Sequence, residues 1–494
     1  MGLINPFFKI ISLALLSVSC HGVGEKVADI DSLICSSAEP CQECSLHETH
    51  MTCTFSYDSA SFLALHFSQF ALQEHDIVKV CDDSESCFPM DHMFKSRAHG
   101  VFWGPSIVGD TIKLVSKLQN PNSHWSISQI SHGYPSLDLR PARRVAENDA
   151  RRDLRVGSRA HSTLFTPETV CTDDDRREAI CYASENPTIY ERAQAVARLI
   201  IQGAWVCTGW LTGTDGHLMT NEHCIGSADD ALNTDVYFDA EDPSCDNPSP
   251  SNVPGVDFAG GTVLMKLDAD KDYALVYIEP YNGKFPAYMP DMLTKRPSLE
   301  PDPTVIMSND DAFAAATLNR QIYIPQHPGG RDKQIAWTDS YHSSGNCTVT
   351  AMGSPYCTAS NPSMYKELSY ACDTEGGSSG SPVLAADTNK VVGLHHCGGG
   401  CAGNVAVALN TIYKDICSDL ATCQVWGCCA FCDVDTDGDG SYDCEDECPL
   451  NPDVQVAGKC GCDEADVDAD GDGILDCLGG APSCAGYCGG SGSD

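Results

Sequence analysis

The sequence predicts a mainly β protein in three structural parts, and three observations support this prediction. Short runs of alternating apolar and polar residues fill two long regions of the 494-residue chain, as in strands that bury one face. After Cys20, the cysteines fall into separate blocks of six, ten and twelve, and each even number suits a closed set of disulfides. Between the regions, the composition changes first to an arginine-rich stretch and later to one rich in Cys, Asp and Gly.

The N-terminus and the overall charge indicate an exported protein. Residues 1–22 combine a short charged start, an apolar run from Ile10 to Val18 and small residues, which is typical of a secretory signal peptide. That run is too short to span a bilayer, so no membrane span is expected. The net charge of −39 would repel a phosphate backbone and so excludes nucleic acid as a partner. The heavy use of cysteine agrees with a secreted, extracellular location.

Residues 24–135 predict an N-terminal β-sandwich. Alternating runs such as Phe62–Phe67 and Asp76–Val80 are separated by turn residues, which favours short strands in packed sheets. The segment from Leu63 to Cys81, in which an aliphatic and aromatic strand is followed by an acidic turn and a second strand, resembles CUB domains. The region carries no catalytic constellation, so we expect an accessory domain or a pro-domain.

Residues 136–166 form an arginine-rich linker in an otherwise acidic chain. The stretch is polar and without periodicity, and it contains Arg140, Arg143, Arg144, Arg151, Arg152, Arg155 and Arg159. One interpretation is a solvated linker. The other is a processing site, because proteolysis concentrates in exposed, flexible segments.

Residues 167–415 carry a second β pattern. We expect strands over residues 193–201, 207–211, 217–220, 235–238, 262–265, 273–278 and 305–307, without regular helices between them. A series of this kind favours a closed or a double β-barrel.

A glycine-rich stretch from Cys372 to Val383 is the first motif with chemical potential. It contains the adjacent serines Ser378 and Ser379. Glycines allow the backbone to turn tightly and to present its N–H groups beside an exposed hydroxyl. Read alone, the motif could equally be a surface loop, so its interpretation depends on a histidine and an acid elsewhere.

A histidine and an aspartate occur in suitable contexts. His223 follows a predicted strand and precedes Cys224, which could form a disulfide with Cys207 and fix the turn. Asp272 stands at the mouth of an apolar strand, where a partly buried acid can reach an imidazole. The two aspartates just before it are competitors that lie farther out in a polar turn.

Together the three motifs resemble the chymotrypsin-like (trypsin-like) serine peptidases. Thr-Asn-Glu-His-Cys, Asp-Tyr-Ala-Leu and Gly-Ser-Ser-Gly-Ser-Pro occur in that family's order, and the first and last look closest to its lysyl- and glutamyl-endopeptidase branch. The resemblance implies a double β-barrel peptidase domain over residues 167–415, which acts on protein or peptide substrates and needs no cofactor for catalysis. Ser379 would be the nucleophile, His223 the general base and then acid, and Asp272 the residue that holds the histidine tautomer. The N–H groups of Gly377 and Ser379 would form the oxyanion hole.

One departure from the family bears on activation. In the animal digestive enzymes, an aspartate directly before the nucleophile pairs with a newly cut N-terminal amine, whereas Ser378 occupies that position here. An N-terminal ion pair is therefore not the expected switch, and an inhibitory pro-segment would act by covering the cleft.

Two residues are candidates for substrate preference. Asp373 lies where trypsin-like members keep the acid that binds Lys or Arg, and His395 lies where the glutamate-specific branch places a histidine. Asp373 could instead be a solvated residue, and His396 rather than His395 could face the pocket. We expect preference for Lys or Arg before the scissile bond, with Glu as the alternative, since an acidic surface attracts cationic peptides.

Residues 416–494 predict a small, cysteine-rich module that binds calcium. Carboxylates at alternating positions, a glycine for a sharp turn and further acids suit a hard cation with oxygen ligands, namely Ca²⁺. The candidate ligands are Asp435, Asp437, Asp439, Asp443 and Asp446 in one copy and Asp468, Asp470, Asp472 and Asp476 in a second. The run and its Cys-Pro-Leu-Asn-Pro ending resemble a thrombospondin type 3 repeat. The alternative is a disordered acidic tail.

Two functions are compatible with this organisation. The leading hypothesis is a secreted serine endopeptidase that forms an acyl-enzyme. The alternative is a calcium-dependent adhesion or matrix protein with an inactive peptidase domain, which contacts the extracellular matrix or a cell surface through its C-terminal module. All three motifs are intact, and this favours the enzyme.

Overall fold

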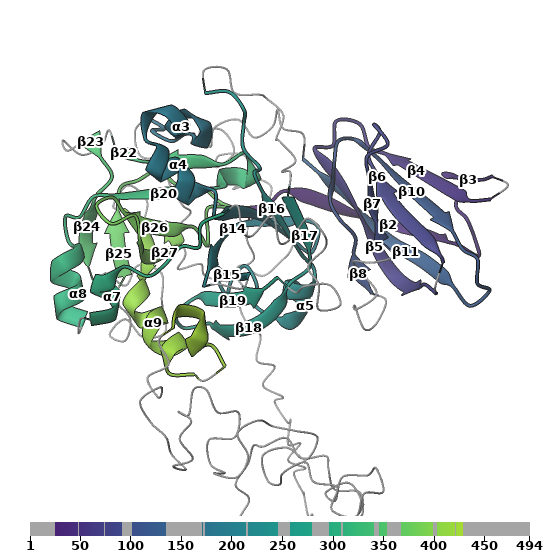
Figure 1. Ribbon diagram of the computed structural model, residues 1–494. Coiled ribbons are helices and arrows are strands. Elements are labelled where there is room, and N and C mark those ends of the chain that lie inside the picture. Colours follow the sequence, from purple (N-terminus) through teal and green to yellow (C-terminus); the bar gives the residue numbers. More distant parts are fainter. Residues whose placement is uncertain are drawn as a thin grey trace, which may run out of the picture.

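The computed structural model describes residues 25–47, 49–73, 75–90, 101–134, 170, 173–213, 216–245, 257–278, 296–307, 310–339, 345–352, 367–398, 403–419 and 421–427. Within these residues, the fold is mainly β, as predicted (Figure 1). The signal peptide, the arginine-rich linker and all nine candidate calcium ligands lie outside the described residues, and these assignments stay predictions.

The N-terminal domain is a sandwich of two five-stranded sheets. One sheet has the order β3-β4-β10-β6-β7, and the other has the order β2-β11-β5-β8 with β9 paired to β5. The strands are β2 (Ala28–Ser36), β3 (Cys44–Leu46), β4 (Met51–Ser56), β5 (Phe62–Ala71), β6 (Ile77–Cys81), β7 (Cys87–Pro89), β8 (Phe102–Trp103), β9 (Ile107–Val108), β10 (Thr111–Lys117) and β11 (His124–Gly133). Alternate apolar side chains, including Leu65, Phe67, Leu114 and Trp125, meet between the sheets in a core that excludes water.

The six cysteines of the first block form three disulfides inside this sandwich. The pairs are Cys35–Cys41, Cys44–Cys53 and Cys81–Cys87. The CUB resemblance itself stays a prediction.

The first barrel sheet carries the histidine and aspartate motifs. Its order is β17-β16-β13-β14-β15-β19-β18, and the short strand β1 (Glu25–Lys26) pairs with β14. The strands are β13 (Val196–Ile201), β14 (Trp205–Thr212), β15 (His217–Thr220), β16 (Thr234–Phe238), β17 (Asp257–Gly260), β18 (Val263–Asp268) and β19 (Tyr273–Tyr277). Every residue of β13 is buried, because this strand is central in the sheet and covered on both faces.

The second barrel sheet carries the serine motif. Its order is β12-β21-β20-β26-β27-β28-β25-β24. The strands are β12 (Arg177–Glu178), β20 (Ile322–Gln326), β21 (Gln334–Ala336), β24 (Val349–Met352), β25 (Glu367–Tyr370), β26 (Pro382–Ala385), β27 (Val391–Gly398) and β28 (Asn404–Ala408), and a separate pair joins β22 (Thr338–Asp339) to β23 (Gly345–Asn346).

Short helices interrupt the β pattern, which the sequence did not predict. They are α3 (Tyr182–Glu185), α4 (Pro187–Ala193), α5 (Ala228–Leu232), α7 (Pro303–Met307), α8 (Asp310–Thr317) and α9 (Leu409–Cys417), with 3₁₀ turns η2 (Ala179–Cys181), η4 (Pro328–Gly330) and η5 (Cys423–Trp426). The strand expected over residues 305–307 is wrong, because α7 occupies this segment. Asp302 accepts a hydrogen bond from the Thr304 N–H at 2.9 Å, and Pro303 opens the helix with a preset φ.

The sandwich and the first barrel share a continuous interface. Strand β1 adds to the barrel sheet, with Glu25 opposite Val206 and Lys26 opposite Trp205 (Figure 1). Val27 and Phe62 from the sandwich side pack in one apolar cluster with barrel residues such as Ile200, Val206 and Tyr237. The two domains therefore bury apolar surface against each other. Their association depends on this interface as well as on the chain that connects them.

None of the described helices is long and apolar enough to cross a membrane.

Candidate active site

A disulfide and backbone hydrogen bonds hold the histidine turn. Strand β15 ends at Thr220, and the N–H groups of Cys224 and Ile225 both donate to the Asn221 carbonyl, which closes a tight turn around His223. Cys224 is joined to Cys207 of the neighbouring strand β14 by a disulfide with an S–S distance of 1.99 Å. The imidazole thus projects from a turn that is anchored on both sides.

Asp272 contacts this turn through both carboxylate oxygens. Its Oδ1 accepts the backbone N–H of His223 at 3.0 Å, and its Oδ2 lies 2.8 Å from the Nδ1 of the same histidine. The Asn221 side chain donates to the Asp272 carbonyl at 2.8 Å. Asp272 has a φ of 45°, a left-handed conformation that is costly for a non-glycine residue. Such strain persists only where surrounding contacts impose it, and here those contacts orient the histidine.

His396 of β27 is a second histidine on the same carboxylate. Its Nδ1 lies 3.2 Å from Oδ2 of Asp272, and its Nε2 lies 3.5 Å from Oε1 of Glu367. The side chains of His396 and Glu367 are each only 1% exposed. The result is a buried chain of charges that runs from Glu367 through His396 to Asp272 and His223.

The chain of contacts shifts two pKa values. Burial raises the pKa of Asp272, but the neighbouring His223 and His396 outweigh burial and hold this pKa well below its usual value. Burial lowers the pKa of His396, whereas the contacts with Asp272 and Glu367 raise it to about 9. At neutral pH, therefore, His396 is an imidazolium, and the Asp272 carboxylate between it and His223 is ionised.

The serine loop, defined here as residues 373–380, lies against the histidine turn. Thr208 of β14 donates its N–H to the Ser379 carbonyl at 2.8 Å and its hydroxyl to the Gly377 carbonyl at 2.9 Å. The Cys224 sulfur lies 4.0 Å from the same Ser379 carbonyl. Gly380 has a φ of 89°, and an added Cβ there would collide with the Thr208 carbonyl. Only glycine permits this close approach of the loop to the first barrel.

The carbonyl groups of the loop indicate where its amides point. The Gly376 carbonyl accepts the Gly329 N–H at 2.5 Å, and the Ser378 carbonyl accepts from Ser381. In a trans peptide, the N–H points opposite to the carbonyl of the same peptide group. The N–H groups of Gly377 and Ser379 are therefore directed away from these partners.

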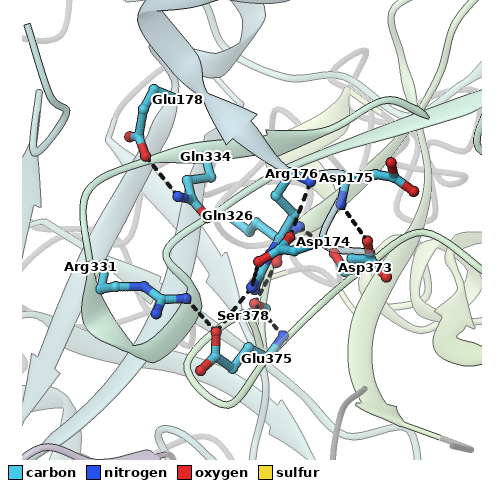
Figure 2. Close-up of polar contacts among 10 residues, drawn as sticks. All are labelled: Asp174, Asp175, Arg176, Glu178, Gln326, Arg331, Gln334, Asp373, Glu375 and Ser378. Atoms are coloured by element: carbon cyan, nitrogen blue, oxygen red, sulfur yellow. Dashed lines mark hydrogen bonds and ion pairs between the residues drawn. The ribbon is translucent and has the colours of Figure 1, made fainter. Parts of the chain in front are cut away.

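Side chains and backbone groups from distant segments form hydrogen bonds with the serine loop (Figure 2). The Ser378 hydroxyl donates to the Gln326 side-chain oxygen at 2.5 Å, and the Gln326 amide donates to the Asp373 carbonyl at 2.9 Å. The Asp373 carboxylate accepts the Asp175 N–H at 2.8 Å. Thus Ser378, where the digestive enzymes keep an aspartate, is bound to a neutral glutamine.

The two specificity candidates are both buried. Asp373 is 2% exposed, so the alternative that it is a solvated residue is wrong. His395 is fully buried, and its Nδ1 contacts the Tyr370 hydroxyl at 2.7 Å. His396 contacts Asp272 instead, as described above. Asp268, one of the two aspartates that competed with Asp272 for the role of the triad acid, forms an ion pair with Lys271.

Two cysteines next to this region carry free thiols. Cys347 and Cys372 are both buried, and burial raises the pKa of each thiol. The ten-cysteine block is therefore not fully paired within the described residues. Cys181–Cys245 is a further disulfide of the peptidase region.

Sequence motifs did not point to several residues of the site. Thr208 and Gln326 are ordinary strand residues, and only the fold brings them to the serine loop. His396 was noticed as a neighbour of His395, but its contact with Asp272 requires knowledge of strand order.

Comparisons with known proteins agree with this arrangement. Residues 207–394, which include His223, Asp272 and Ser379, match a family described as a trypsin-like peptidase domain. Over 353 residues, the chain is 32% identical to "Secreted RxLR effector protein 73" of Plasmopara viticola, and the match covers 69% of this chain and 75% of that protein.

Similar solved structures include "HtrA-type protease AlgW with tripeptide" and "Crystal structure of Deg5". The first is 13% identical with a TM-score of 0.32, and the match covers 48% of this chain and 65% of that chain. The second is 16% identical with a TM-score of 0.32, and the match covers 47% of this chain and 90% of that chain. The match over 353 residues shows that the chain belongs to the same family as the Plasmopara viticola effector protein 73, and its residues 207–394 match a trypsin-like peptidase domain.

Proposed function

We propose that the protein is a secreted serine endopeptidase in which Ser379, His223 and Asp272 form the catalytic triad. The observation that carries this proposal is the contact of both Asp272 oxygens with His223 beside the serine loop. Because Asp272 holds Nδ1, Nε2 is the histidine nitrogen left to take the serine proton.

The reaction would proceed through an acyl-enzyme. The Ser379 oxygen attacks the scissile carbonyl carbon while His223 accepts the hydroxyl proton. The carbonyl oxygen becomes an oxyanion that the N–H groups of Gly377 and Ser379 stabilise. The C–N bond then breaks as His223 returns the proton to the leaving amine, and water hydrolyses the ester by the same steps in reverse. Asp272 stabilises the imidazolium in each step.

Labelling with a fluorophosphonate tests this mechanism directly. The purified wild-type protein should take up one reporter per chain and hydrolyse a casein substrate, whereas Ser379→Ala should do neither. Ser45→Ala, which removes an exposed serine hydroxyl of the sandwich, is the control, and it should keep the label. A folded wild-type protein that takes no label would sink the peptidase and favour the adhesion protein.

For specificity, we propose preference for Lys or Arg before the scissile bond. The support is the buried carboxylate of Asp373, six positions before Ser379. A second buried acid, Asp339, lies near enough to act with Asp373 in raising the pKa of the Cys347 and Cys372 thiols. Two negative groups in a buried region favour a cationic side chain.

Cleavage of a peptide library would decide the preference. Cuts after Lys and Arg should dominate, and Asp373→Asn should lower kcat/KM on these substrates on the order of a hundredfold. Asparagine still offers an oxygen to the Asp175 N–H, so the loop contact is kept. Dominant cleavage after Glu would overturn the assignment and point to His395.

Export and calcium binding complete the proposal. The secreted relative and the N-terminal sequence support an extracellular location.

The carboxylate spacing after Cys417 supports a calcium-stabilised module with contact to matrix or cell surface. Digestion with proteinase K, with and without chelator, tests this module: calcium should protect residues 416–494, and identical fragments would contradict it. N-terminal sequencing of the secreted protein tests processing in the linker, and a start near Gly24 would exclude it.

A further inference from the structure

A buried arginine, Arg176, contacts the serine loop through Glu375 (Figure 2). The Arg176 side chain is only 2% exposed. Its Nε and Nη2 donate to the two oxygens of Asp174 at 2.8 and 2.6 Å, and Nη2 also donates to Oε2 of Glu375 at 3.1 Å. Arg331 donates to the same Glu375 oxygen from the opposite side. Two guanidinium groups thus hold one carboxylate of the serine loop.

In these ion pairs the Arg176 guanidinium is shielded from water, whereas the side chains of Asp174 and Glu375 are 49% and 28% exposed. Burial lowers the pKa of Arg176, but Asp174 and Glu375 outweigh it and raise this pKa above its ordinary value. A buried guanidinium is tolerated only with good partners, and removal of one partner leaves an uncompensated charge. Glu375 is therefore fixed more firmly than a surface glutamate would be.

Glu375 controls the turn that carries the two oxyanion amides. The Ser378 N–H donates to the Glu375 carbonyl at 2.9 Å, and the Glu375 N–H donates to the Ser378 hydroxyl at 3.2 Å. These reciprocal bonds close the turn around Gly376 and Gly377. When the Glu375 side chain is held, the peptide groups on either side of Gly377 are held with it.

The segment that carries Arg176 is itself anchored to the second barrel. Arg177 pairs with Ile335 at the edge of the sheet, and the Ala179 N–H donates to the Lys333 carbonyl. Its Asp175 N–H holds Asp373 at the start of the serine loop, while Arg176 holds Glu375 farther along. Three consecutive residues, 174–176, therefore hold the loop at two points.

We propose that residues 174–176 are a clamp that preorganises the oxyanion hole, with Arg176 as a positioning residue that acts through Glu375. This inference rests on the proposed function. In the digestive enzymes, an N-terminal amine fixes the serine loop through the aspartate at the position of Ser378. Here the clamp would fix the loop instead, with side chains from within the chain. The clamp follows the arginine-rich linker in sequence, so cleavage in residues 136–166 would leave it attached to the peptidase.

Charge-removing variants test the clamp. Arg176→Gln and Glu375→Gln should each lower kcat on a chromogenic peptide amide roughly 10- to 100-fold with KM changed by less than about threefold, since a misplaced oxyanion donor acts on the transition state. The double variant should be no slower than the worse single variant, because both changes remove the same contact. Arg176→Lys should recover part of kcat.

Arg177→Gln is the matched control. Arg177 is the next residue, and its ion pair with Glu185 is exposed, with side chains 42% and 50% accessible. This variant should keep the wild-type kcat. If Arg176→Gln fails to fold by circular dichroism, Glu375→Gln carries the test, since Glu375 is 28% exposed and its replacement keeps the side-chain shape.

The results separate the clamp from the proposed function. If the wild type is labelled by fluorophosphonate and the folded clamp variants keep the wild-type kcat, the clamp is wrong and the peptidase stands. A fall in thermal stability with unchanged kcat would also overturn it, because Arg176 would then be only structural. If the folded wild type takes no label, the proposed function falls and the clamp with it.

Discussion

The two halves of the site are held by different kinds of interaction. The histidine turn is fixed by a covalent cross-link, Cys207–Cys224, and by backbone hydrogen bonds within one barrel sheet. The serine loop is fixed by side chains from separate segments, chiefly Arg176, Gln326 and Arg331, through ion pairs and one glutamine bridge. The histidine side should therefore respond to reductant, and the serine side to changes of charge.

Loss of the cross-link should have the largest effect on stability. Cys207→Ser with Cys224→Ser opens a loop with a sequence separation of 17, and a loop of that size contributes about 3 kcal/mol. Urea unfolding of the peptidase region should show this loss, and kcat should fall because His223 is less well positioned. Removal of the Cys44–Cys53 disulfide in the sandwich is the control and should leave kcat unchanged. If the two disulfide variants have equal kcat, the Cys207–Cys224 disulfide does not position His223.

The buried contacts of His396 with Asp272 and Glu367 should make the free energy of unfolding depend on pH. The pKa of His396 is raised from 6.5 to about 9 in the folded protein. Its contribution is therefore fully present below pH 6.5 and is lost as pH rises through about 9. Asp272 and Glu367 raise this pKa through hydrogen bonds and charge, and burial opposes them. The loss should be about 3 kcal/mol, since one pKa unit corresponds to about 1.4 kcal/mol.

Denaturant titrations at pH 6, 7.5 and 9 check this expectation. The wild type should lose stability across the series, and His396→Gln should have a flatter profile with a lower plateau at pH 6. Parallel profiles for the two proteins would show that the charge of His396 does not stabilise the fold. His66→Gln in the sandwich removes an imidazole far from Asp272 and is the control.

A smaller effect should come from the contact between the N-terminal strand and the serine loop. An added Cβ at Gly376 would collide with the Glu25 side chain. Gly376→Ala should therefore cost about 1 kcal/mol, because an exposed, flexible side chain can move aside. Glu25→Ala should reduce this cost in a double-mutant cycle measured by thermal unfolding. Strictly additive effects would show that the strand and the loop do not interact.

The sequence predicted those parts of the molecule that depend on local pattern. Alternation in the strands and the three motifs led to the sandwich, the double barrel and the candidate triad. The helix α7 was missed because Val305 and Ile306 are β-branched, whereas its start depends on Asp302 and Pro303.

The supports of the site could not be predicted in the same way. Arg176 and Glu375 are far apart in sequence. Glu375 lies in the glycine-rich stretch, but Arg176 belongs to no motif, so no pattern linked the two. His396 meets Asp272 only because β27 and the aspartate turn belong to different barrels that face each other. Such contacts depend on how the sheets pack, and a single sequence carries no periodic signal of that packing.

The pairing of β1 with β14 has a consequence for a chain cut in its linker. Each of the fully described disulfides lies within the sandwich or within the peptidase region. Cleavage would therefore yield two pieces on a denaturing gel. In native buffer, they should still sediment as one particle, because Glu25–Lys26 completes the partner's sheet and Val27 and Phe62 fill its apolar cluster. The sandwich would then behave as a tightly bound subunit of the peptidase rather than as a discarded pro-domain.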